Sequence, residues 1–418
     1  MSFSNSRTAC VQALHRWESG ATFADEVLHS TLAEARFNVF DRAFLTETFY
    51  GILRRRSALD FLIRQLRDTD LDSETRQVLR LGFYQIFWMR IPHHAAVNET
   101  VNLAGRARGL VNALLRRAIR EKELLDEKLA EAPASVRFSH PKFLIERWES
   151  QFTPEETARL CEWNNTPAEI YVRANRLKVT TGELLAASPS VAEASGLHPL
   201  SIRVKQVPFQ WLMEGLCYVQ DPSTLMAVEL LDPKPGDTIL DACAAPGGKA
   251  SYMAELMGNS GRVVACDSSR PRLERLRENM LRMNVSCVET RRVDWLARPL
   301  PFDPESFDRI LVDAPCSNTG VIRRRVDVRW RLTPGDFEEM PRRQRAILDA
   351  VFPLLKPGGT LVYSTCSMEP EEDNAVAEAF ARETPGVRLE ETGRRTPHRD
   401  AMDGAFAARL VKGSSGAQ

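Results

Sequence analysis

Two cysteines stand where predicted strands end, in the stretches LVDAPCSNTG (residues 311–320) and VYSTCSMEPEED (residues 362–373). Each apolar run gives way to polar residues at its cysteine, Cys316 in the first and Cys366 in the second. Ligands of open α/β sheets bind at the carboxyl ends of the strands, so both thiols are expected at one binding edge. A single free cysteine is more often a small buried apolar residue. Two cysteines at equivalent strand ends favour a nucleophilic role.

A loop with two glycines lies between a predicted strand and a predicted helix, in the sequence ILDACAAPGGKAS. Gly247 and Gly248 would let the backbone approach a ligand, and the start of the helix offers free N–H groups. Asp267 ends the next strand, 19 residues after Gly248, where an acid suits the two hydroxyls of a ribose. The alternative is a tight turn that binds no ligand. The strand before the loop and the position of Asp267 make that alternative less favoured.

The composition of this loop separates the candidate cofactors. It is not G-x-G-x-x-G, and Ala-Ala-Pro occupies much of it, so few glycines remain to wrap a pyrophosphate. This disfavours NAD and favours S-adenosylmethionine, which has a ribose and no phosphates. The ribose would pair with Asp267, and the charged aminoacyl and sulfonium end would lie near Asp241. Asp294 could receive the adenine amino group, although a strand-end carboxylate in a turn is the commoner reading.

A thiol beside a methyl donor indicates a specific chemistry. Carbon 5 of a pyrimidine is too weakly nucleophilic to take a methyl group. A thiolate added to carbon 6 turns the ring into an enamine, whose carbon 5 can attack the sulfonium. Asp313, three residues before Cys316, is predicted to stabilise the adduct at ring nitrogen 3. A second group must then help to remove the carbon-5 proton and release the enzyme.

The elements that must position these residues follow from the hydrophobic pattern. Residues 1–130 keep apolar residues at helical spacing and predict an all-α domain, followed by linker helices over 131–165. The strand-like pieces EIYVRAN and IRVKQV predict a small α+β subdomain over 166–219. Strands and helices alternate over 220–412, which predicts a mostly parallel sheet with helices on both faces. Residues 413–418 predict a disordered tail.

Composition sets the broad class. The chain has 418 residues, 43% hydrophobic and 27% charged, which indicates a globular protein of two to three domains. No apolar stretch approaches the roughly 20 residues of a membrane span, so we expect a cytoplasmic protein with no membrane partner. The eight cysteines include no C-x-x-C pair, which argues against a zinc site and predicts no metal.

Charge is informative only locally, because the formal net charge is zero. We expect MEPEED to open a solvated helix, with Glu371, Glu372 and Asp373 as its first turn. Arginine-rich runs are often only solvated faces, but beside a base-modifying site phosphate contacts become the better interpretation. That interpretation covers the arginines that follow Cys316: Arg323, Arg324, Arg325, Arg329, Arg331, Arg342, Arg343 and Arg345.

Three motifs together resemble a known family. DACAAPGGK, DAPCSNTGVIRR and YSTCSMEPEED resemble the RNA 5-methylcytosine methyltransferases of the Nop2/Sun type, and VQDPSTLMAVELL matches the same family. DRAFLTETFYGILRRRSALD, IPHHAAVNETVNLA and LVNALLRRAIRE resemble a NusB-like RNA-binding helical domain. The resemblance implies an α/β chain. A Rossmann-like class I methyltransferase domain would follow a small α+β subdomain and an all-α NusB-like N-terminal domain.

The resemblance also implies a role for each candidate residue. Cys366 would be the nucleophile, Cys316 would assist product release, and Asp313 would complete the catalytic set. The cofactor S-adenosylmethionine would contact Cys243, Ala244, Ala245, Pro246, Gly247, Gly248, Lys249, Asp267, Arg272, Asp294 and Asp313.

The implied activity is methylation of carbon 5 of a specific cytosine in 16S rRNA, through a covalent adduct between Cys366 and carbon 6. The expected substrate is single-stranded or loop RNA whose cytosine leaves its stack. We expect no DNA partner and a monomeric protein. Three alternatives stay open: the same chemistry on tRNA, a non-catalytic NusB-like RNA-binding factor, and a dinucleotide-dependent oxidoreductase that the loop composition disfavours.

The sequence departs from the family pattern at three positions. Asn318 stands where glycine is usual, Val326 where proline is usual, and Ala405 where an aromatic residue is usual. None of these changes removes a reacting group. They bear on the shape of the pocket for the target base, and so on which nucleotide is modified.

Overall fold

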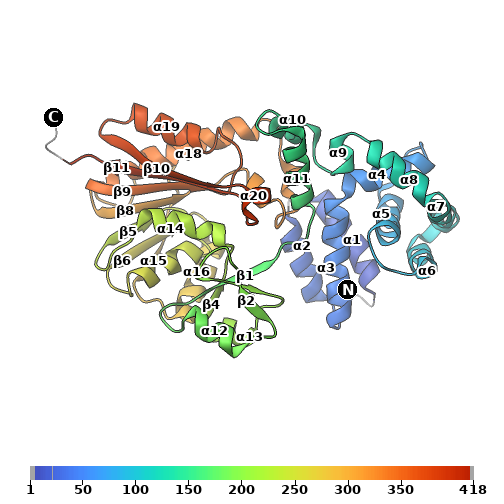
Figure 1. Cartoon of the computed structure of the whole chain (residues 1–418), viewed down its shortest axis with the longest axis horizontal. Coiled ribbons are helices and arrows are strands. Elements are labelled where there is room, and N and C mark those ends of the chain that lie inside the picture. The colour runs from blue at the N-terminus through green and yellow to red at the C-terminus, as the bar shows by residue number, and fades with distance from the viewer. Residues whose placement is uncertain (1–4, 21, 415–418) are drawn as a thin grey trace. The chain divides into compact units, whose positions relative to one another are not determined.

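The computed structural model describes residues 5–20 and 22–414 of the chain (Figure 1). The chain forms two compact units, Met1–Thr166 with Ile322–Leu332, and Pro167–Val321 with Thr333–Gln418. Residues 415–418 of the predicted disordered tail lie outside the described residues. No helix within the described ranges is long and apolar enough to span a membrane. The domain boundaries proposed from the sequence stay predictions.

The described part of the first unit is helical, as the apolar spacing of its sequence predicts. Residues 95–129 belong to three of these helices, α6 to α8. The helices are α1 (Ser6–Ser19), α2 (Ala24–Glu34), α3 (Val39–Arg54), α4 (Arg56–Leu66), α5 (Ser73–Phe87), α6 (His93–Leu103), α7 (Arg108–Arg120), α8 (Lys122–Glu131), α9 (Ala134–Arg137), α10 (Lys142–Glu149), α11 (Pro154–Asn164) and α17 (Val328–Arg331).

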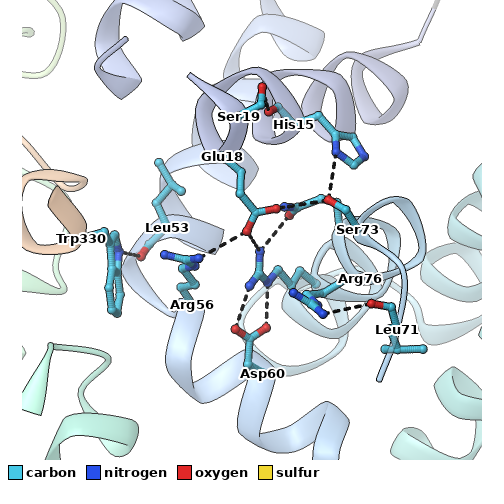
Figure 2. A network of polar contacts seen from close by, with 12 residues as sticks. His15, Glu18, Ser19, Leu53, Arg56, Asp60, Leu71, Ser73, Arg76 and Trp330 are labelled. Carbon is cyan, nitrogen blue, oxygen red and sulfur yellow. Dashed lines mark hydrogen bonds and ion pairs between the residues drawn. The ribbon is translucent and has the colours of Figure 1, made fainter. Parts of the chain in front are cut away.

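A polar network that includes Glu18 and Asp60 (Figure 2) ties α1, α4 and α5 together. The buried Arg80 of α5 is part of it. The guanidinium of Arg80 donates to both carboxylate oxygens of Asp60 at 2.7 Å and to Glu18 at 3.3 Å. Glu18 also accepts from Gln77 at 2.6 Å and from Arg56 at 3.3 Å. An unpaired buried charge is costly, so this set of partners fixes how the three helices pack.

The segment 322–332 lies far along the chain but packs into the first unit. The carboxylate of Asp327 accepts from the Trp17 indole at 3.0 Å and from the backbone N–H of Ala24 at 2.9 Å. The indole of Trp330 donates to the carbonyl of Leu53 at 2.9 Å, as Figure 2 also shows. The alternation of strands and helices along 220–412 gave no sign that these residues join the helical unit.

The predicted phosphate role of the arginines after Cys316 is wrong for Arg329. Its side chain is fully buried and donates to Asn165 Oδ1 at 2.7 Å and to the carbonyl of Asn164 at 3.0 Å. Arg323 is also buried, with its guanidinium 4.0 Å from the centre of the Trp163 ring. Burial lowers the pKa of Arg329 to about 9. These two side chains organise the helical unit, because RNA phosphates cannot reach a buried guanidinium.

The second unit begins with a small antiparallel sheet of strand order β2-β3-β1-β4. The predicted strands EIYVRAN and IRVKQV correspond to β1 and β3. Arg173 of β1 donates to Ser251 Oγ of α15 at 2.8 Å and forms a buried ion pair with Glu255 on the same helix. The sheet is thereby joined to α15. Its elements are β1 (Ile170–Ala174), α12 (Thr181–Ala187), β2 (Ala192–Ala194), β3 (Ser201–Val204), α13 (Phe209–Met213) and β4 (Cys217–Val219).

The larger sheet has the order β10-β11-β9-β8-β5-β6-β7. Strands β9, β8, β5, β6 and β7 pair in parallel, and β10 and β11 add an antiparallel edge. The mostly parallel sheet predicted from the sequence is confirmed. The strands are β5 (Thr238–Asp241), β6 (Arg262–Asp267), β7 (Val288–Arg292), β8 (Phe307–Asp313), β9 (Leu355–Thr365), β10 (Val387–Arg395) and β11 (Ala405–Lys412).

Helices cover both faces of this sheet, as Figure 1 shows. Alternate residues of a strand point to opposite faces, so Ile239 packs with α14, α15 and α16 while Leu240 packs with α18 and α19. Both faces are apolar, which explains why the parallel strands read as continuous hydrophobic runs. The helices are α14 (Leu225–Leu231), α15 (Gly248–Leu256), α16 (Arg270–Met283), α18 (Asp336–Val351), α19 (Asn374–Glu383) and α20 (Pro397–Asp400).

Candidate active site

The two cysteines follow the carboxyl ends of neighbouring parallel strands, β8 and β9. The strands pair with Asp313 opposite Ser364, so the loops that continue from them leave the sheet side by side. The sulfur atoms of Cys316 and Cys366 lie 3.1 Å apart, within hydrogen-bonding distance. Cys316 is buried, whereas Cys366 is partly exposed. The structure therefore brings together the two thiols that the sequence placed at equivalent strand ends.

Close backbone packing holds the two loops against each other. The N–H of Gly320 donates to the carbonyl of Cys366 at 3.0 Å, and the N–H of Gly404 donates to the carbonyl of Gly320 at 2.8 Å. A Cβ added at Gly320 would lie 2.7 Å from the Cys366 carbonyl oxygen and 2.8 Å from the Gly404 Cα. Only glycine permits this approach, which fixes the backbone on either side of the thiols.

The expectation of a solvated helix turn at Glu371, Glu372 and Asp373 was wrong for Glu372 and Asp373, although Glu371 is exposed. Helix α19 begins at Asn374, and the side chains of Glu372 and Asp373 are fully buried. Glu372 accepts from the N–H of Ser317 at 2.8 Å, from Ser367 Oγ at 2.9 Å and from Gln344 Nε2 at 3.0 Å. Ser317 and Ser367 directly follow the two cysteines. One carboxylate therefore ties both cysteine loops to α18.

The neighbouring carboxylate of Asp373 anchors the end of β9. It accepts from Thr365 Oγ1 at 2.6 Å and lies 2.8 Å from a guanidinium nitrogen of Arg394 on β10. Burial raises the pKa of Asp373 to about 7, although Arg394 opposes that shift. Thr365 directly precedes Cys366, so this contact limits how far the cysteine can move.

Asn318 contributes a contact that the sequence did not reveal. Its backbone has φ of 59°, the left-handed region in which asparagine is the commonest residue after glycine. Its Nδ2 donates to the Cys316 carbonyl at 2.7 Å, and its Oδ1 accepts from the Cys366 thiol at 3.2 Å. Asparagine thus keeps the backbone geometry expected of glycine and adds a polar group beside the reacting sulfur. The turn-forming sequence SNTG was the available signal.

The two thiols differ in their surroundings. The hydrogen bond with Cys366 and burial raise the pKa of Cys316 well above its ordinary value. Cys316 therefore stays protonated at neutral pH. A thiolate, not a thiol, is the reactive form of cysteine, so the buried Cys316 is poorly suited to be the nucleophile of the pair.

A cluster of charges lies beside the thiols at the ends of β5 and β8. Lys249 forms an ion pair of 2.7 Å with Asp313, which also accepts from Ser364 Oγ at 2.8 Å. Burial lowers the pKa of Lys249, but Asp313 outweighs it, so the net shift is upward. The negative form of Cys366 also contributes to this upward shift. The ammonium group of Lys249 therefore belongs to the same cluster as Asp313 and the cysteine pair.

Asp241 is a buried carboxylate whose oxygens lack hydrogen-bond partners among the described residues. It is fully buried, and neither oxygen makes a well-formed hydrogen bond with the described residues. Burial and the charge of Asp313 raise its pKa to about 8. A buried carboxylate needs a cation or several donors to stay ionised. The positively charged amino and sulfonium groups of S-adenosylmethionine would supply such a partner, so the residues present fit this cofactor.

The glycines of the loop after β5 are required by packing within the protein. Gly247 has φ of 105°, and a Cβ there would lie 2.9 Å from the Met280 side chain of α16. A Cβ at Gly248 would lie 3.0 Å from the ring of Tyr218. The predicted reason, close approach of a ligand, is thus not needed to explain either glycine. The remaining predicted contact residues of this loop are Cys243, Ala244, Ala245, Pro246 and Lys249.

Asp267 ends β6 as predicted, and Arg272 connects it to the loop after β5. The carboxylate of Asp267 accepts from the N–H of Ser269 at 2.9 Å and pairs with Arg272 at 3.3 Å. Arg272 also donates to the carbonyl of Ala245 at 2.5 Å. One arginine therefore links the predicted ribose acid to the predicted cofactor loop.

Asp294 is less clearly part of the site. Its side chain is exposed and accepts from the N–H of Leu296 at 3.0 Å, the local turn that the sequence offered as the commoner reading. The next residue, Trp295, is buried and donates to the carbonyl of Ala242 at 2.6 Å. Asp294 thus lies on a loop that touches the cofactor loop, and its contact with the adenine stays a prediction.

The other two departures from the family pattern lie in different surroundings. Val326 is fully buried in the apolar core of the helical unit. Ala405 begins β11, is buried, and packs with the α14 and α15 face of the sheet. No group of His, Cys, Asp and Glu suited to a metal ion occurs among residues 5–20 and 22–414.

Three family models match the chain. The model described as 16S rRNA methyltransferase RsmB/F matches residues 228–411, the NusB family model matches residues 4–120, and an RsmF/B-like ferredoxin-like domain matches residues 140–207. Together with the topology above, these matches confirm the predicted fold class: a Rossmann-like methyltransferase domain, an α+β part and a NusB-like helical domain.

Whole proteins match over nearly the full length. Ribosomal RNA small subunit methyltransferase B of Vibrio cholerae is 37% identical over 408 residues, covering 91% of this chain and 92% of the relative. The protein of the same name from Salmonella arizonae is 37% identical over 394 residues, covering 89% and 91%. The crystal structure of PH0851 has a TM-score of 0.80 at 26% identity and covers 97% of this chain and 98% of its own.

Proposed function

Because the chain belongs to the 16S rRNA methyltransferase RsmB/F family, we propose that it methylates carbon 5 of a specific cytosine in 16S rRNA through a covalent Cys366 adduct. Its cofactor is S-adenosylmethionine. The observation that carries the proposal is the pair of sulfurs of Cys316 and Cys366, 3.1 Å apart at neighbouring strand ends. A methyl transfer that needed no covalent activation would not require two thiols at that place.

Cys366 would attack first. Its thiolate forms a bond to carbon 6 of the cytosine, and the displaced π electrons make carbon 5 nucleophilic. The ammonium group of Lys249 would support the thiolate electrostatically. Asp313, held by Lys249 and Ser364, would pass the proton that it shares with Lys249 to ring nitrogen 3, which neutralises the charge that the attack places on the ring and stabilises the adduct. The cofactor, when bound, supplies the electrophilic methyl group that carbon 5 takes.

Release needs two further events. The proton on carbon 5 must pass to water or another base, and the electrons of that C–H bond must re-form the ring double bond as the bond between Cys366 and carbon 6 breaks. Cys316, in contact with the Cys366 sulfur, is the candidate for assisting this step. Its own raised pKa keeps it a thiol during the attack, so the two cysteines need not compete for carbon 6.

The substrate is proposed to be single-stranded or loop RNA. A cytosine must leave its stack to reach Cys366, and the free-energy cost of this step is lower for an unpaired base than for a paired one. Exposed arginines of the NusB-like part offer phosphate contacts, among them Arg106 on the 3₁₀ turn Gly105–Ala107 and Arg116 and Arg120 on α7. The family favours 16S rRNA over tRNA, and we expect the protein to act as a monomer.

Two substitutions test the chemistry. Cys366→Ala is expected to abolish transfer of labelled methyl groups to 16S rRNA, because no thiolate remains. Cys316→Ala is expected to leave a covalent protein–RNA complex that survives denaturing electrophoresis. The control is Cys287→Ala, which removes a half-buried thiol just before β7. Persistent turnover by the Cys366 variant would refute the adduct, and methylation of tRNA but not of 16S rRNA would favour the alternative substrate.

A further inference from the structure

The side chain of Asn318 bonds to both cysteine residues. It donates to the Cys316 carbonyl and accepts from the Cys366 thiol. We propose that Asn318 is a positioning residue that holds Cys366 as a hydrogen-bonded thiol and fixes the direction of its sulfur until substrate is in place. The inference rests on the nucleophilic role proposed for Cys366.

The orientation of the Asn318 amide follows from its partners. A carbonyl oxygen can only accept, so the amide group 2.7 Å from the Cys316 carbonyl must be the nitrogen. The amide oxygen must then face the Cys366 sulfur, at 3.2 Å. Because that oxygen cannot donate, Cys366 must be the donor in this contact. Its own sulfur is then left to accept from Cys316, 3.1 Å away.

These contacts form a closed ring that favours the neutral thiol at Cys366. A hydrogen bond to the neutral form of a group opposes its ionisation. When Cys366 loses its proton, the partly negative amide oxygen faces a negative sulfur, and the contact becomes repulsive. The Asn318 side chain must then turn away, which frees the sulfur on the side that the amide had covered. The side chain therefore restrains the nucleophile in the resting enzyme.

The backbone at Asn318 makes this proposal directly testable. Its left-handed φ of 59° is one that glycine adopts without strain. Asn318→Gly therefore removes the amide without disturbing the turn. Asn318→Asp keeps the size of the side chain and places a full negative charge beside the Cys366 sulfur.

The measurement is the rate at which iodoacetamide alkylates Cys366 at pH 7.5 in the full-length protein, quantified on the peptide that carries Cys366. We expect Asn318→Gly to be alkylated about fivefold faster than the wild type, the factor that corresponds to one ordinary hydrogen bond of about 1 kcal/mol. We expect Asn318→Asp to be alkylated more slowly than the wild type. Slower reaction in a variant of equal size separates the hydrogen bond from simple steric cover.

A matched control uses the same substitution in the same backbone conformation. Asn284 ends α16 with φ of 60°, so Asn284→Gly should leave the alkylation of Cys366 unchanged. Equal acceleration in both glycine variants would overturn the proposal, because it would reflect general loosening. Unchanged alkylation in Asn318→Gly, or alkylation of Asn318→Asp as fast as wild type, would overturn it too. None of these readings uses RNA, so the proposal can fail while the methyl-transfer role of Cys366 stands.

Discussion

The buried carboxylate of Asp241 lowers the stability of the unliganded protein and offers a binding partner for a positively charged ligand. Folding raises the pKa of Asp241 from an ordinary 3.8 to about 8. The folded protein thus holds that proton more tightly than the unfolded chain does. The stability that the protonated group contributes is fully present below pH 3.8 and is lost as the pH rises toward 8. An unliganded protein should therefore be strained at Asp241 in mildly basic solution.

We expect Asp241→Asn to stabilise the unliganded protein at pH 8 by roughly 1–3 kcal/mol, the usual range for an unpaired buried polar group. The gain should shrink at pH 5, where the wild-type carboxyl is protonated. The same variant should bind S-adenosylmethionine at least about tenfold more weakly, a loss of about 1.4 kcal/mol. Urea unfolding at both pH values and calorimetry check this.

The control for Asp241→Asn is Asp303→Asn, which neutralises an exposed carboxylate of the same unit. It should change neither the pH dependence of unfolding nor cofactor affinity. An Asp241 variant that is destabilised at pH 8, or that binds the cofactor as tightly as wild type, would contradict the assignment of Asp241 to the cofactor's cationic end.

At the scale of elements, strands β8 and β9 bring the two thiols to one edge of the sheet. The buried carboxylate of Glu372, after β9, holds the two cysteine loops together. Removing the carboxylate in Glu372→Ala takes one acceptor away from each of the Ser317 N–H, the Ser367 hydroxyl and the Gln344 amide. Buried unpaired donors cost about 1–3 kcal/mol each, although neighbouring groups relax. We expect a loss of about 2–4 kcal/mol in unfolding free energy and at least a tenfold loss of methyl transfer.

The comparison variant for Glu372→Ala is Glu378→Ala on the exposed side of α19. It should unfold within about 0.5 kcal/mol of the wild type and keep its activity. If Glu372→Ala matched it in both measurements, the carboxylate would not be what holds the two cysteine loops.

The sequence predicts the position of those site residues that stand at the ends of strands, because the pattern of apolar residues shows where each strand ends. Cys316, Cys366, Asp267 and Asp313 were placed correctly because each stands at the end of an apolar run, and parallel strands deliver their carboxyl ends to one edge. The burial of Glu372 was not predictable in this way. A run of acidic residues is expected to be exposed to solvent unless the groups that donate hydrogen bonds to it are known. The donors to Glu372 come from three separate segments of the chain.

Arg329 shows the same limit for a basic residue. Its partners Asn164 and Asn165 lie more than 160 positions earlier in the sequence, so no local pattern could reveal them. The hydrogen bonds of Asn318 were hidden for a different reason. The turn signal predicts a backbone conformation, but the direction of a side chain depends on the neighbouring loop.

At the scale of the whole molecule, chain order and unit membership do not coincide. The segment 322–332 immediately follows one of the cysteine loops, yet it supplies buried partners to the helical unit. Asp327 accepts from Trp17 and Ala24, and Trp330 donates to Leu53. A cut between the matched NusB region and the rest of the chain would therefore remove part of the helical core.

We expect a fragment ending at residue 166 to be less stable than the same helices in the full chain, because the Trp17 indole and the Ala24 N–H lose their acceptor. A synthetic peptide of residues 320–334 should raise the melting temperature of the fragment with increasing concentration, as for any ligand of the folded state. The same peptide carrying Asp327→Ala should do so more weakly. A fragment as stable as the intact unit, or one equally stabilised by both peptides, would show that the segment merely fills space on a core that is already complete.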